Sequence, residues 1–130
     1  MSPRRGLPRR KGNQDASGLL PLTPLACSIL LALVESDLHG YGIAQRISAR
    51  DTGGITLAPG NLYAALDRLI GAGLVEKAAA SSGARSARRG REYRITPFGR
   101  KVAALEAARL QALVRMARRL DLLPVKPSTP

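Results

Sequence analysis

Aromatic residues, cysteine and histidine are scarce in this sequence of 130 residues. It has no tryptophan, one phenylalanine and three tyrosines, so its core must be built from aliphatic side chains. The single cysteine, Cys27, excludes an intrachain disulfide and a cysteine-based zinc site, and a small buried hydrophobe is its simplest role. The single histidine, His39, removes most histidine-based catalysis and metal binding. With no visible catalytic triad or phosphate loop, we expect neither an enzyme nor a bound cofactor or metal.

Long apolar runs are also missing. The longest nearly apolar stretch, residues 25–34, is far shorter than the roughly 20 residues that a membrane-spanning helix needs. No apolar segment follows the basic N-terminus before Pro21, so we expect no secretory signal. These features predict a cytoplasmic protein with no membrane partner.

Acidic residues are few, with 9 Asp and Glu against 21 Lys and Arg, which gives a formal net charge of +12. The excess lies in residues 1–22, 76–95 and 96–120, whereas residues 23–75 are slightly acidic. Such a distribution favours a polyanionic partner, nucleic acid first and a membrane surface second. A biased genomic composition is an alternative source of arginine, but it does not explain why the charge avoids the middle of the chain.

Start and stop signals divide the chain into elements. Residues 1–22 have no apolar periodicity, which predicts a disordered basic arm. Residues 123–130 are expected to form a flexible tail. Thr23 and Pro24 form an N-cap followed by a first-turn proline, which predicts a helix buried on most of its sides. Further helices are expected over 40–50, with Tyr41, Ala44 and Ile47 on its apolar side, and over 59–72, with Gly73 as its stop.

The second half of the chain predicts a hairpin and a long helix. Residues 74–79 and 91–95 are expected to form two strands joined by a long basic turn. Thr96 and Pro97 repeat the cap-and-proline start of a helix that runs to about Leu120, on which Glu106 and Arg109 can pair. The order predicts a mainly α fold with a small β-hairpin, namely a winged helix-turn-helix domain over 23–95 and a dimerisation helix over 96–122.

Four segments resemble the PadR family of bacterial transcriptional regulators: Leu38–Ile43, Gly60–Leu69, Gly71–Val75 and Tyr93–Gly99. The resemblance extends over roughly residues 23–120. It implies a dimeric DNA-binding repressor that recognises inverted-repeat operators and is released by a small aromatic or drug-like effector. The single final helix is similar to that of the family's shorter members, in which it mediates dimerisation. The chain has no tryptophan, and so lacks the residues between which some family members stack flat drugs.

The third helix is the expected reading element. Asn61, Ala65 and Arg68 fall at i, i+4 and i+7, which predicts a shared face opposite the core. Asn61 can pair with adenine, Ala65 can touch a thymine methyl, and Arg68 can reach guanine or a phosphate. The alternatives are a local backbone bond for Asn61 and a surface ion pair for Arg68. Tyr63 is either a core aromatic or, as the resemblance implies, a phosphate contact, and one ring can serve both roles.

Two further sets of residues complete the predicted interface. Phosphate neutralisation needs only charge and reach, so the predicted contacts on the hairpin tip are Arg85, Arg88, Arg89 and Arg91. The predicted dimer interface on the last helix comprises Val102, Leu105, Leu113, Met116 and Leu120, the alternative being a helix folded back on its own chain. The basic arm either enters a minor groove or only aids solubility.

The leading hypothesis is therefore a sequence-specific, nucleoid-associated transcriptional repressor that binds double-stranded DNA as a homodimer. The main alternative is a non-specific nucleic-acid-binding protein that coats the nucleoid or binds RNA. A third hypothesis is a protein-interaction adaptor whose winged fold has lost DNA binding.

Overall fold

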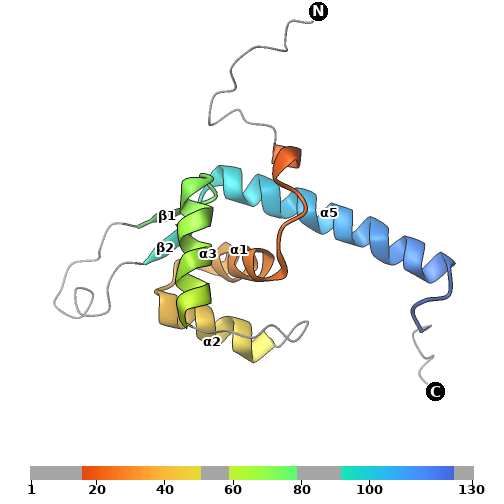
Figure 1. The fold of residues 1–130 in the computed structure, drawn as a ribbon, viewed down its shortest axis with the longest axis horizontal. Helices are drawn as coiled ribbons and strands as arrows, with labels where there is room; N and C mark the ends of the chain where they lie inside the picture. Colours follow the sequence, from red (N-terminus) through yellow and green to blue (C-terminus); the bar gives the residue numbers. More distant parts are fainter. Residues whose placement is uncertain (1–15, 51–58, 79–91, 125–130) are drawn as a thin grey trace, which may run out of the picture.

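The computed structural model describes residues 16–50, 59–78 and 92–124 of the chain. Its elements are, in order, η2 (Ala16–Leu19), α1 (Pro24–Glu35), α2 (Gly40–Arg50), α3 (Pro59–Gly71), β1 (Val75–Lys77), β2 (Tyr93–Ile95) and α5 (Pro97–Arg119) (Figure 1). This confirms the predicted mainly helical fold with a small antiparallel hairpin. The strands are three residues long, shorter than the sequence pattern indicates.

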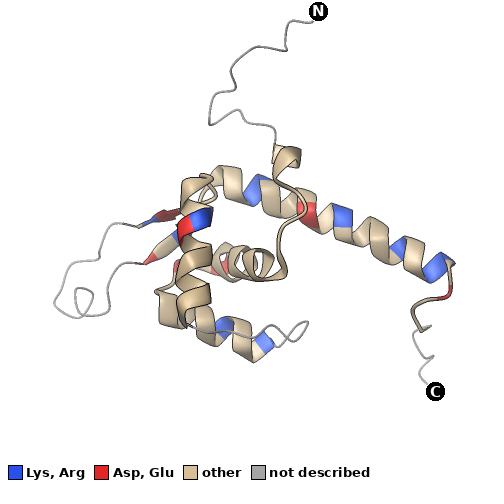
Figure 2. Cartoon of the chain, in the orientation of Figure 1, with Lys and Arg blue, Asp and Glu red and all other residues tan. Residues whose placement is uncertain are grey.

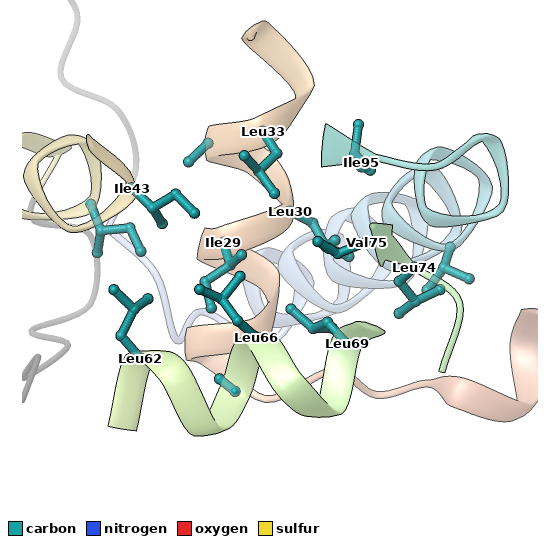
Figure 3. Packing of buried hydrophobic residues seen from close by; sticks show 14 of the residues in the cluster. Ile29, Leu30, Leu33, Ile43, Leu62, Leu66, Leu69, Leu74, Val75 and Ile95 are labelled. Carbon is teal, nitrogen blue, oxygen red and sulfur yellow. The ribbon is translucent and has the colours of Figure 1, made fainter. Parts of the chain in front are cut away.

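Helix α1 lies at the centre of the fold and contacts α2, α3, α5 and β2. Thr23 caps it as predicted, since its side chain accepts a hydrogen bond of 3.0 Å from the backbone N–H of Ala26. Its buried residues Ile29, Leu30 and Leu33 meet aliphatic side chains from every neighbouring element (Figure 3). The predicted aliphatic core is confirmed.

Glycine ends α3 and directs the chain into the hairpin. Gly73 has a φ of 83°, and its N–H donates to Ile70 O while Leu74 N–H donates to Leu69 O. This is a Schellman cap, which favours glycine because other residues rarely adopt a positive φ. The turn places β1 directly after the helix, and β1 pairs with β2 in the register Val75↔Ile95.

The hairpin base is fixed to the helical domain by its second strand. Leu38, between α1 and α2, forms a β-bridge with Tyr93 through two backbone hydrogen bonds. Arg94 extends this link, because its guanidinium lies 3.2 Å from Asp37 and 3.7 Å from Glu76. The two strands are therefore held in place beside α3 (Figure 1).

The predicted disordered arm is wrong for residues 16–22. They form the short helix η2 and a following extended segment that packs on α5, with Ala16 buried. Leu19, Leu20 and Leu22 lie against the core, so this segment hides enough apolar surface to be ordered. The remainder of the predicted arm, residues 1–15, lies outside the described residues, as do residues 125–130.

Helix α5 begins in the core and ends far from it (Figure 1). The Thr96 hydroxyl accepts from Gly99 N–H at 2.9 Å and donates to Gly73 O at 2.7 Å, so one side chain caps α5 and holds it to the end of α3. At the other end, Asp121 has a φ of 61° and closes a second Schellman cap. No helix among the described residues has both the length and the apolar character to cross a membrane.

Candidate nucleic-acid interface

Helix α3 has one buried and one uncovered face. Leu62, Leu66 and Leu69 point into the core, toward α1 (Figure 3). The uncovered side carries Tyr63 and residues that are small or polar: Gly60, Asn61, Ala64, Asp67, Arg68 and Gly71. Asn61 and Arg68 are thus exposed, as the sequence predicts, and the face they lie on meets no other described element.

The prediction for Ala65 is wrong. Its side chain is only 4% exposed and belongs to the hydrophobic core. Each residue of a helix turns by about 100° about the axis, so four residues make one full turn and about 40° more. Ala65 is therefore rotated by about 40° from Asn61, toward the core. Ala64, on the other side of Asn61, is the exposed alanine of this helix.

Tyr63 joins α3 to the start of α2. The side chain is 47% exposed, but its hydroxyl end lies over the backbone of Gly40, where even a methyl group would collide with the ring. The ring therefore packs against α2 but is not part of the buried core, and the predicted phosphate contact of Tyr63 stays a prediction. Tyr41, expected on the buried side of α2, is exposed instead and accepts a hydrogen bond from Gln45.

The Tyr63 edge of α3 faces the hairpin. Tyr93 on β2 has a raised pKa, caused first by burial and then by the neighbouring Tyr63 and Asp67. Asp67 lies one turn after Tyr63 on the same helix. Tyr63 thus lies on the hairpin side of the exposed face, whereas Asn61 and Arg68 lie on its other side.

Many cations outside this face are already paired. Glu35 binds both Arg46, at 3.0 Å, and Arg50, while Arg94 binds Asp37. Arg68 forms no ion pair with any residue in ranges 16–50, 59–78 and 92–124. Basic and acidic positions lie close together on α3 (Figure 2). The predicted wing contacts Arg85, Arg88, Arg89 and Arg91 lie outside the described residues.

Helix α5 and the residues that follow it present an uncovered apolar surface, which we call the α5 patch. Its members are Leu105, Leu110, Leu113, Val114, Met116, Leu120, Leu122 and Leu123. Four of the five residues predicted for a dimer interface belong to it. The fifth, Val102, is fully buried in the chain's own core, so its assignment to a subunit interface is wrong.

The predicted pair of Glu106 and Arg109 is present and is bidentate, with hydrogen bonds of 2.6 and 2.9 Å. The sequence does not show that Glu106 is also 1% exposed and accepts the backbone N–H of Leu22. The Arg109 guanidinium, against the opposing effect of burial, holds the pKa of Glu106 below its usual value. Burial and the nearby Glu106 raise the pKa of Cys27. The described residues hold no cluster of His, Cys, Asp and Glu that could bind a metal.

Three packed helices, a two-stranded wing and a long final helix define a winged-helix protein. The family model for PadR-like transcriptional regulators matches residues 29–105, more than half of the chain. The protein therefore belongs to the PadR-like family of transcriptional regulators.

Solved structures show the same fold. A PadR family regulator from Clostridium difficile has a TM-score of 0.64 and 22% identity, over 75% of this chain and 98% of that one. A PadR-like regulator from Bacillus cereus has a TM-score of 0.62 and 17% identity, over 83% and 96%. The transcriptional regulator BldR from Sulfolobus solfataricus has a TM-score of 0.61 and 29% identity, over 78% and 66%. No curated protein sequence matches significantly.

Proposed function

We propose that the protein is a homodimeric repressor that binds double-stranded DNA at an inverted-repeat operator. The uncovered face of α3 is the observation that carries this proposal. The face carries Asn61 and Arg68, which forms no ion pair with a described residue, and α3 lies beside the hairpin. A transcriptional regulator needs an exposed element of this kind, because base edges are read by side chains that enter a groove.

The dimensions of α3 fit a major groove. Thirteen residues make a helix of about 20 Å, and the B-DNA major groove admits an α-helix. We assign Asn61 to a contact with adenine, Arg68 to one with guanine or a phosphate, and Tyr63 to a phosphate contact. The wing arginines 85, 88, 89 and 91 remain our predicted contacts with the DNA backbone.

The α5 patch supports the dimer. An uncovered apolar surface of this extent on the projecting half of a helix is typical of a protein interface. A second copy of the chain is the simplest occupant, because two-fold symmetry places two α3 helices in successive major grooves, about one helical turn apart. Leu105, Leu113, Met116 and Leu120 are the residues we assign to this interface.

The family resemblance further implies that a small aromatic or drug-like effector releases the repressor from DNA. Because the operator is its site of action, we also propose that the protein resides in the cytoplasm, on the nucleoid.

DNA binding measured against salt concentration tests this function. We expect the logarithm of the affinity to fall steeply and linearly with the logarithm of salt concentration, and cognate DNA to bind more tightly than a scrambled duplex. Asn61→Ala and Arg68→Ala should each weaken cognate binding about 10-fold. Lys101→Ala, which also removes an exposed charge but lies on α5, is the matched control for Arg68→Ala. Equal affinity for all duplexes, untouched by Asn61→Ala, would instead support the non-specific alternative.

A further inference from the structure

We propose that Asp67 is a specificity-determining residue that selects a cytosine in each operator half-site. The inference rests on the proposed function, because it requires α3 to lie in the major groove. It concerns the one acidic residue of α3, to which neither the charge pattern nor the family resemblance assigns a role.

Asp67 lies on the part of α3 that can come closest to a partner. Along the middle of the uncovered face the residues are Gly60, Ala64 and Gly71, which have little or no side chain. A methyl group added at Gly60 or Gly71 would meet nothing within 4 Å, so no other described part of the chain covers these two positions. A helix with such a surface allows its backbone to approach a groove floor closely, which brings short side chains such as aspartate within reach of base edges.

The carboxylate of Asp67 lies on the exposed side of α3. It forms no ion pair with any described residue, although Arg68 is its neighbour in sequence. A free negative charge on a surface that faces DNA weakens binding unless it meets a hydrogen-bond donor, because phosphates repel it.

Base chemistry limits which donor Asp67 can meet in the major groove. Cytosine presents only its N4 amino group there, whereas guanine and thymine present acceptors that repel a carboxylate. Adenine presents a donor beside an acceptor, which suits an amide side chain such as asparagine better than a carboxylate. Asp67 therefore favours cytosine and disfavours the other three bases at one position.

Two substitutions at position 67 test the inference. The probes are the palindromic duplex that the wild-type protein selects from a random pool and a set of duplexes with each half-site base pair changed in turn. Wild-type protein should prefer one C·G pair about 10-fold. Asp67→Ala should abolish that preference, and Asp67→Asn should shift it toward adenine, while the preferences at other positions and the slope of affinity against salt stay unchanged.

Asp121→Asn is the matched control. It removes the same charge at the far end of α5, and asparagine tolerates the positive φ of that position. It should behave like the wild type. A thermal melt of each variant confirms that the fold is retained.

The possible outcomes separate the inference from the proposed function. If Asp67→Ala and Asp67→Asn change affinity for all duplexes by the same factor, Asp67 acts only through its charge and the inference is wrong. If the wild-type protein has no sequence preference at all, the proposed function itself is contradicted, and the inference with it.

Discussion

At the scale of single residues, Glu106 joins α5 to the segment before α1. It lies on α5, binds Arg109 one turn later, and accepts the backbone N–H of Leu22 in the segment before α1. Its carboxylate is buried, so it depends on these partners for compensation. Loss of the charge would therefore weaken both the ion pair and the attachment of residues 16–22.

Glu106→Gln should lower the free energy of unfolding by about 2 kcal/mol at neutral pH. The folded-state pKa of Glu106 lies below its unfolded value, so its stabilising contribution is present above the unfolded pKa and is lost as pH falls through the folded pKa. Chemical denaturation of both proteins between neutral and acidic pH, at one protein concentration, measures this. The difference between them should shrink in acid, and a difference independent of pH would contradict the role given to the charge.

Gly99 is the residue at which a single methyl group should cost most. A β-carbon there would collide with the carbonyl oxygen of Leu74 and lie 2.8 Å from Ile95 Cγ1, so α5 and the hairpin would have to separate. We expect Gly99→Ala to lower the free energy of unfolding by about 1–3 kcal/mol. Gly18→Ala, where a methyl meets nothing within 4 Å, is the control. Thermal melting of both variants checks this, and equal melting temperatures would be contrary evidence.

At the scale of elements, helix caps decide where α1 and α5 begin. Thr23 and Thr96 both accept a hydrogen bond from the third residue of their helix. The Thr96 hydroxyl also donates to the carbonyl oxygen of Gly73, the glycine of the cap that follows α3. The second cap thus links two elements, whereas the first serves only its own helix.

Thr96→Ala should therefore be more destabilising than Thr23→Ala. The loss of a cap costs about 1 kcal/mol, and the lost bond to Gly73 O adds about 1 kcal/mol at Thr96. Urea denaturation of the two variants measures the difference. Equal losses of stability would show that the link between α5 and α3 contributes nothing.

These caps also show which features could be predicted from sequence. Thr23 with Pro24, Thr96 with Pro97, and Gly73 act through local backbone geometry, so the helix bounds they predict agree with the structure to within a residue or two. Burial depends on what a helix meets in three dimensions. Ala65 lies at the edge of the buried face, where periodicity alone does not decide the side, and its small side chain gives no further signal.

Longer-range contacts account for the remaining differences. Val102 fits the apolar stripe of α5, but only the fold shows that the first turns of that helix lie in the chain's own core. Residues 16–22 have no periodic pattern, because an irregular segment that packs on another element needs none. The burial of Glu106 follows from that same packing. Local sequence therefore predicts neither the ordered structure of residues 16–22 nor the burial of Glu106.

At the scale of the whole molecule, the two uncovered surfaces lie on separate parts of the chain. The uncovered face of α3 is polar and lies beside the hairpin, whereas the α5 patch is apolar and lies on the projecting half of the last helix (Figure 1). A dimer through α5 leaves both α3 helices free. The proposed assembly thus uses each surface for one partner.

Leu113→Glu should convert the dimer into a monomer, because it places a charge in the middle of the α5 patch. Gln111→Glu adds the same charge on the opposite side of α5 and should remain dimeric. Sedimentation equilibrium gives the mass of each variant. DNA affinity should fall with the loss of the dimer, since each monomer then holds only one half-site, and a dimeric Leu113→Glu protein would contradict the assigned interface.

Selection of bound duplexes from a random DNA pool, followed by the mass of the resulting complex, would show whether two copies of the chain read one operator. We expect a palindromic sequence whose half-sites lie about 10 base pairs apart, bound by two copies of the chain. Enrichment of no sequence, or a complex that contains a single copy, would contradict it.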